Sequence, residues 1–187
     1  KKLLLMVLSS TSNERFLALD ILSNLIVART SKVLGSWPNF IRTLTYLSTS
    51  KQDTNVETRL LSCKCIRRLA LNISTRDSCH QDLLDSMITI ATKSKEKGCL
   101  LWIAKAFVDQ SLNVGTGFLL ARTKPAICAM LRLTACRDNR VKELSMESIA
   151  NLCEESTNAR KLSMNSGVLR AVCDGMKLTC NNNNNNT

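Results

Sequence analysis

The feature that most constrains the fold is an apolar pattern of helical spacing, whose clearest copy runs over residues 141–153. A helix built from this stretch places the following side chains on one side: Val141, Leu144, Ser145, Ile149 and Leu152. A stripe of this kind is typical of a helix that is buried along one face. The small Ser145 side chain within the stripe would let a neighbouring helix come close.

Three earlier stretches carry a related pattern and are expected to form long helices of the same kind. They span residues 14–28, 56–71 and 98–108. In the first, the expected stripe consists of Leu17, Ala18, Leu22 and Leu25. In the second, it consists of Leu61, Ser62, Ile66 and Leu69.

The stretch at 98–108 is the weakest copy, and two registers are open for it. One register aligns Phe107 with Leu152. The other is shifted by one residue and puts Cys99 and Ile103 on the stripe instead. We prefer the first register because it keeps the large Phe107 side chain buried.

The four copies recur at a nearly regular spacing. Their last stripe residues are 44, 38 and 45 residues apart: Leu25, Leu69, Phe107 and Leu152. Armadillo and HEAT repeats have periods of roughly 40–47 residues, whereas tetratricopeptide and ankyrin repeats have periods of about 33–34. Apolar residues make up 44% of the chain but aromatic residues only 4%, which favours helices over a β-sandwich.

Residues 141–176 resemble an armadillo repeat. In that family the third helix of a repeat typically ends in an Ala-x-x-x-Leu-x-Asn-Leu pattern, and the first two helices meet at a glycine. The matching residues here are Ser145, Ile149, Asn151, Leu152 and Gly167. The resemblance implies an all-α fold, a right-handed superhelical solenoid of about four armadillo- or HEAT-like repeats.

The repeat array is expected to span residues 1–180, with residues 1–8 forming the end of a preceding repeat. Because the chain does not begin with Met, we expect it to be a fragment of a larger protein. Residues 181–187 contain a run of asparagines and are expected to form a disordered tail, since such a low-complexity segment cannot build a core.

In armadillo solenoids the third helices line a concave groove, and the residue at the Asn position projects into it. A side-chain amide there can donate to a peptide carbonyl and accept from a peptide N–H, so it can hold an extended backbone. Here the Asn position is occupied by Asn24, Arg68, Ala106 and Asn151. The resemblance, with the position four residues earlier included, implies a peptide-binding groove lined by Asp20, Asn24, Lys64, Arg68, Trp102, Glu147 and Asn151.

This groove departs from that of the nuclear-import adaptors of the family, which pair a Trp with the Asn. Only Trp102 matches the aromatic residue, and its own repeat lacks the Asn, which argues against a receptor for nuclear localisation signals. Lys64, Arg67 and Arg68 instead form a basic helix face that can grip an acidic peptide or a phosphate. The alternatives are that these cations are solvated or paired with carboxylates, that the asparagines bond to their own helix turn, and that Trp102 belongs to the core.

The predicted function is a protein–protein interaction scaffold or adaptor that binds an extended, acidic or mixed-charge peptide segment in this groove. The net charge of +11 leaves nucleic acid, in particular RNA, as the alternative partner. That alternative would require Lys and Arg side chains clustered along one continuous face. A structural segment without a ligand of its own is a further alternative, and the oligomeric state is open.

Residues that support catalysis are sparse. His80 is the only histidine, Cys63 and Cys65 are too close for the usual zinc spacing, and no glycine-rich phosphate loop is present. We therefore expect no enzymatic activity, no cofactor and no metal ion.

The nine cysteines are odd in number and contain no Cys-x-x-Cys pair. This usage indicates a reduced, intracellular protein, cytoplasmic or nuclear. No stretch reaches the roughly 18 apolar residues needed to span a bilayer, so no membrane partner is expected.

Overall fold

The structure is a computed structural model that describes residues 2–8, 11–37, 39–50 and 55–183, with the backbone alone described for residue 4 and residues 175–183. Within these ranges the regular secondary structure is entirely α-helical, which confirms the all-α prediction. The helices are α1 (Lys2–Val7), α2 (Ser12–Leu25), α3 (Ala28–Gly35), α4 (Phe40–Thr49), α5 (Val56–Asn72), α6 (His80–Lys93), α7 (Lys97–Ser111), α8 (Val114–Arg122), α9 (Lys124–Thr134), α10 (Asn139–Glu154), α11 (Ser156–Ser163) and α12 (Ser166–Asn183).

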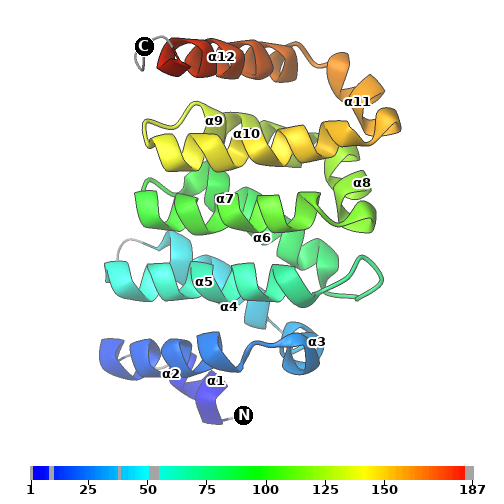
Figure 1. Cartoon of the computed structure of the whole chain (residues 1–187). Coiled ribbons are helices and arrows are strands. Elements are labelled where there is room, and N and C mark those ends of the chain that lie inside the picture. Colours follow the sequence, from blue (N-terminus) through cyan, green and yellow to red (C-terminus); the bar gives the residue numbers. More distant parts are fainter. Residues whose placement is uncertain (1, 9–10, 38, 51–54, 184–187) are drawn as a thin grey trace.

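Four long helices lie side by side on one face of the molecule, which we call the ladder face (Figure 1). They are α2, α5, α7 and α10, and each packs against the next. α4, α6 and α9 lie behind them and, with α12 at the C-terminal end of the stack, form a second row in which each helix again contacts its neighbour (Figure 1). The short helices α3, α8 and α11 lie along one side, at the right of Figure 1.

The core lies between the two rows. The side chains of Leu44, Ile66, Ile90 and Phe107 are 0% exposed, and they come from α4, α5, α6 and α7 in turn. Removing apolar surface from water stabilises the fold by about 25 cal/mol per Å². Because each helix is apolar mainly along one side, it must lie against its neighbours to bury that surface.

Side-chain caps begin two of the ladder helices. At the start of α5, Asn55 Oδ1 accepts a hydrogen bond from the Thr58 N–H at 2.8 Å. At the start of α10, Asp138 Oδ1 accepts one from the Val141 N–H at 3.2 Å. Such caps satisfy backbone N–H groups that have no partner within the helix, and so they determine where the helix begins.

Three of the expected long helices coincide with ladder helices. The stretch at 56–71 corresponds to α5, that at 98–108 lies within α7, and that at 141–153 lies within α10. The expected helix at 14–28 is wrong at its end, because α2 stops at Leu25 and a separate helix, α3, follows.

The break after α2 has a local cause. Val27 is in an extended conformation, with φ −129° and ψ 172°. Its N–H donates to Thr30 Oγ1 at 3.0 Å, and the Ser31 hydroxyl donates to the Val27 carbonyl oxygen at 2.8 Å. These contacts start α3 at Ala28, because hydroxyl side chains near a helix start compete with continuation of the preceding helix.

The buried side of α2 also differs from the expected stripe. Leu17 and Leu25 were expected in the core, but they are 54% and 47% exposed. Ala18 and Leu22 are buried as expected, and the other buried residues on this side are Leu19, Ser23 and Ile26. The helix is therefore turned by one residue, about 100°, from the expected orientation. Apolar residues occur around much of α2, so its packing against α1 and α5 decides which of them are buried.

At the two ends of the chain, α1 begins at Lys2 within the expected helix end at 1–8, and α12 extends to Asn183. α12 thus includes the first three residues of the tail that was expected to be disordered, while residues 184–187 lie outside the described residues. Within the part of the chain that the structure describes, no helix is both long and apolar enough to cross a membrane.

Candidate functional site

The centre of the ladder face carries a group of cations around one tryptophan. Lys64, Arg67 and Arg68 lie on α5, and Trp102 and Lys105 lie on α7. The Arg67 guanidinium carbon is 5.6 Å and Lys105 Nζ is 4.9 Å from the centroid of the Trp102 ring. At these distances the ring face attracts both cations. We call these five partly exposed residues the basic–aromatic cluster.

Within the cluster, an ion pair between helices holds Arg67 in place. Arg67 Nε donates to Asp109 Oδ2 at 2.8 Å, and Arg67 Nη2 donates to Asp109 Oδ1 at 3.5 Å. This two-point contact joins α5 to α7 and orients the guanidinium next to Trp102.

The other three cations of the cluster are not neutralised in this way. Among the described residues, no carboxylate lies within ion-pair distance of Lys64, Arg68 or Lys105. Since the charge of Arg67 is compensated by Asp109, these three side chains supply the positive potential that a ligand would meet.

A hollow of about 420 Å³ lies beside the cluster. Lys64, Arg67, Arg68 and Trp102 line it, together with Val27 from the extended link between α2 and α3. Because this link replaces the helix expected there, it leaves space at the end of α2 next to the cations of α5. The cluster therefore borders a concave surface instead of a flat one.

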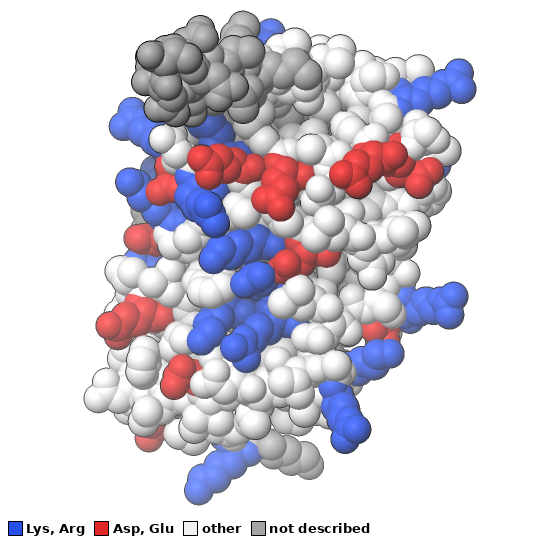
Figure 2. Space-filling model, in the orientation of Figure 1, with Lys and Arg blue, Asp and Glu red and all other residues white. Residues whose placement is uncertain are grey.

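The next helix of the ladder, α10, carries Arg140 and Lys142 near its start and exposed glutamates along the rest of its length. Figure 2 shows blue side chains over α5 and α7 and a row of red side chains along α10. The acidic residues of α10 and of the residue directly after it are Glu143, Glu147, Glu154 and Glu155, and all four are exposed. The ladder face is thus divided into a basic band and an acidic band.

The structure brings together Lys64, Arg68 and Trp102 of the predicted groove, which all line the same hollow. Asp20 and Asn24 lie on α2 and do not line this hollow. Asn24 Nδ2 donates to the Asp20 carbonyl oxygen at 3.1 Å. The Asn24 amide N–H is therefore used within its own helix, as the alternative reading of these asparagines proposed.

The predicted groove residues of α10 lie apart from the cluster. Glu147 belongs to the acidic band. Asn151 Nδ2 donates to Ser111 Oγ at 3.0 Å, so this side chain joins α10 to the end of α7. It does not line the hollow beside Trp102.

The structure differs from the expectation at the Asn position of the third copy, which was expected to project into the groove. Ala106 is 0% exposed and does not line the face. Phe107, Cys99 and Ile103 are also 0% exposed, so the residues of both proposed registers are buried. Sequence reasoning missed Lys105 as a member of the cluster. Its position three residues after Trp102, on the same side of a helix, is the signal that could have identified it.

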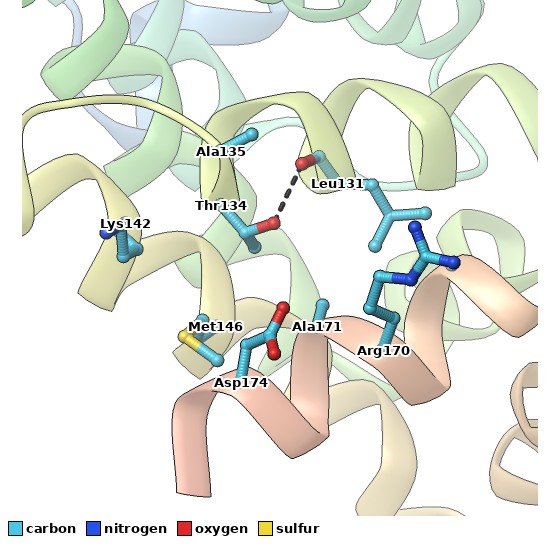
Figure 3. Close-up of a pocket in the computed structure, with 9 residues that line it drawn as sticks. Leu131, Thr134, Ala135, Lys142, Met146, Arg170, Ala171 and Asp174 are labelled. Carbon is cyan, nitrogen blue, oxygen red and sulfur yellow. Dashed lines mark hydrogen bonds between the residues drawn. The ribbon is translucent and has the colours of Figure 1, made fainter. Parts of the chain in front are cut away.

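A separate hollow of about 300 Å³ lies between α9, α10 and α12 (Figure 3). Leu131, Met146 and Ala171 supply apolar lining, and Thr134 Oγ1 donates to the Leu131 carbonyl oxygen at 2.7 Å within α9. Gly167 lies in the first turn of α12, where an added Cβ would be 2.9 Å from Leu131 Cδ1. The hollow therefore lies where α12 packs against α9 and α10.

The described cysteines are free thiols, and several belong to the core. Burial raises the pKa of the Cys65 thiol to about 12 and also raises that of Cys63 well above its ordinary value. Protonated, buried thiols of this kind are small apolar core residues. The described residues contain no group of three or more His, Cys, Asp or Glu side chains that could hold a metal ion.

His80 is buried at the start of α6, and burial lowers the pKa of its imidazole, against a smaller opposing effect of a hydrogen bond with Gln110. The folded state therefore favours neutral His80. Stability should be highest above the ordinary value of 6.5 and should fall as the pH drops below it, because the unfolded chain then binds the proton more readily.

This pH dependence can be measured by urea unfolding at a series of pH values between about 7.5 and 5. His80→Gln should flatten the dependence in this range. An equally steep decline in the variant would show that His80 is not its source. Asp77 does not interfere, since the Ser74 N–H lowers the pKa of its carboxylate below an ordinary value of 3.8.

Comparison with known proteins supports the fold. No protein-family model matches the sequence, and no curated protein matches it. Among solved structures, the chain is similar to the crystal structure of an engineered protein from the Northeast Structural Genomics Consortium, with a TM-score of 0.63 and 16% sequence identity. The similarity covers 91% of this chain and 74% of that chain. At this identity the likeness concerns the fold alone.

Proposed function

We propose that the protein is a non-catalytic protein–protein interaction module that binds an extended acidic segment of a partner on its ladder face. The observation that carries this proposal is the basic–aromatic cluster, in which Lys64, Arg68 and Lys105 have no carboxylate partner among the described residues. Carboxylates of a ligand would pair with these cations, and Trp102 would pack against the ligand's apolar atoms.

We further propose that the fold is a right-handed solenoid of about four armadillo-like repeats, with α2, α5, α7 and α10 as the third helices. The side-by-side order of these helices and their recurrence along the chain support this assignment. In such a fold the exposed side of the third helices is the ligand-binding surface. The free thiols fit a protein that works inside the cell.

An RNA ligand is the second candidate, because the chain carries a net charge of +11. An RNA strand that followed the ladder face would pass from the basic band onto the glutamates of α10 (Figure 2). Repulsion between these carboxylates and the phosphates disfavours such a path. An acidic segment confined to the basic band avoids this repulsion.

The proposal is tested by reversing the two unpaired charges of α5. In the double variant Lys64→Glu and Arg68→Glu, the affinity for a fluorescein-labelled peptide of ten alternating Glu and Ser residues should fall about tenfold or more, measured by fluorescence anisotropy. Both side chains are partly exposed, so the fold should persist, and circular dichroism would verify this.

The matched control is Lys93→Glu with Lys95→Glu, which changes the net charge equally at exposed positions in and after α6, outside the ladder face. This control should bind the peptide with nearly unchanged affinity. Equal losses in the two double variants would indicate attraction to overall charge, and would contradict a specific site at the cluster.

A further inference from the structure

A second hollow lies at the edge of the ladder face, where α7, α8, α10 and α11 meet, and we call it the edge hollow. Its volume is about 510 Å³. Leu112, Val114 and Phe118 line it and are 65%, 84% and 41% exposed. Large apolar side chains gathered at an open hollow typically mark an interaction surface, because their exposure to water is unfavourable.

The rim of the edge hollow is acidic. Glu154 and Glu155 line it and are both exposed, and the residues that line it include no lysine or arginine. Glu154 is the last residue of α10, where the helix dipole already places partial negative charge. Glu155 caps the N-terminal end of α11, whose dipole has the opposite sign, so the attraction for a cation at this position comes from the two carboxylates.

The floor offers a hydrogen-bond acceptor. Asn151 Nδ2 donates to Ser111 Oγ at 3.0 Å, which orients the amide and leaves its carbonyl oxygen to accept from a ligand N–H. Gly117 maintains the shape of this floor, because an added Cβ would lie 2.9 Å from the Ser111 carbonyl oxygen. The close approach of α8 to the end of α7 thus depends on this glycine.

One cation lies close to the lining. The Arg122 guanidinium carbon is 3.3 Å from the centroid of the Phe118 ring. Because this ring already carries a cation, a positively charged ligand group should go to Glu154 and Glu155 instead, while an apolar side chain contacts Leu112 and Val114.

We propose that the edge hollow binds a peptide segment of a partner protein in which a bulky apolar residue and a lysine or arginine are adjacent in the sequence. The apolar side chain enters the hollow, and the cation pairs with Glu154 or Glu155 at the rim. This ligand is opposite in charge to the one proposed for the basic–aromatic cluster. The two sites are independent, and the failure of one would leave the other in place.

The test uses the full chain and fluorescein-labelled peptides that contain two Leu-Arg pairs in a Gly-Ser background. The Leu-Arg peptide should bind about tenfold or more tightly than matched peptides with Leu-Glu or Ser-Arg pairs, because the first of these loses the charge complementarity and the second the apolar contact. Saturable binding should be visible by fluorescence anisotropy. No saturable binding, or equal binding of the three peptides, would overturn the proposal.

The site is located with the double variant Glu154→Lys and Glu155→Lys, which should weaken Leu-Arg binding about tenfold or more. Glu154 lies at the C-terminal end of α10, where lysine suits the helix dipole, whereas Glu155 is the N-cap residue of α11, where lysine does not. Both side chains are exposed, and circular dichroism verifies that the double variant is folded. The control Glu143→Lys with Glu147→Lys makes the same charge change on α10, away from the edge hollow, and should bind nearly as the unmodified chain does. Equal losses in both variants would overturn the assignment.

Discussion

Replacing Phe107 with alanine should lower the free energy of unfolding by about 3–5 kcal/mol. Phe107 is 0% exposed and is the largest of the fully buried side chains. It lies on α7, which packs against both α5 and α10, so the lost ring would leave a cavity in the middle of the ladder. Its neighbours are held by further helices on either side, and they can fill the cavity only in part.

Urea unfolding followed by circular dichroism measures this loss. Phe118→Ala is the matched control, since it removes the same ring from a side chain that is 41% exposed. The control should cost about 1 kcal/mol. A loss below about 1 kcal/mol for Phe107→Ala would show that α7 is not packed at the centre of the fold.

Leu22→Ala and Leu25→Ala should differ sharply in stability, although the chemical change is the same. Leu22 is 2% exposed and Leu25 is 47% exposed. The first substitution should cost about 2–5 kcal/mol and the second less than about 1 kcal/mol. Leu22 is on the buried side in both orientations, so the result for Leu25→Ala decides how α2 is turned. Urea unfolding measures both losses, and a loss for Leu25→Ala as large as that for Leu22→Ala would restore the orientation expected from sequence.

The helices with distinct apolar stripes and capping residues are the ones that could be predicted from sequence. In α5, the cap at Asn55 and the apolar stripe indicate the same helix. In α10, the cap at Asp138 and the apolar stripe do so as well. The orientation of α2 could not be predicted in this way. Its apolar residues occur around much of the helix, so its orientation depends on contacts with α1 and α5, which lie outside the segment.

Helix α8 shows a second limit. Glycine disfavours a helix, so the sequence around Gly115 and Gly117 does not by itself indicate one. In the structure the Asn113 side chain accepts hydrogen bonds from the N–H groups of Gly115 and Thr116 and starts a helix there. Gly117 is needed for close packing against the end of α7, so tertiary contact outweighs the helix propensity of the residue.

The candidate site was predictable in part. The grouping of Lys64, Arg68 and Trp102 came from their equivalent positions in neighbouring copies, and the structure places them around one hollow. The pairing of Arg67 with Asp109 depends on the register between α5 and α7, which spacing within one helix cannot give. The edge hollow draws on four helices, so no single stretch of sequence indicates it.

The fluorescence of Trp102 can report directly on whether an acidic peptide binds at the basic–aromatic cluster. The chain contains two tryptophans, Trp37 and Trp102, so the variant Trp37→Phe retains only the one within the cluster. Titrating this variant with the unlabelled Glu-Ser peptide, and separately with a ten-nucleotide single-stranded RNA, follows the fluorescence of Trp102.

We expect a saturable change in Trp102 fluorescence with the peptide, at lower concentrations than with the RNA, and its loss when Lys64→Glu and Arg68→Glu are added. A change produced by the RNA while the peptide leaves Trp102 fluorescence unaltered would contradict peptide binding at the cluster, and would assign the basic band to nucleic acid.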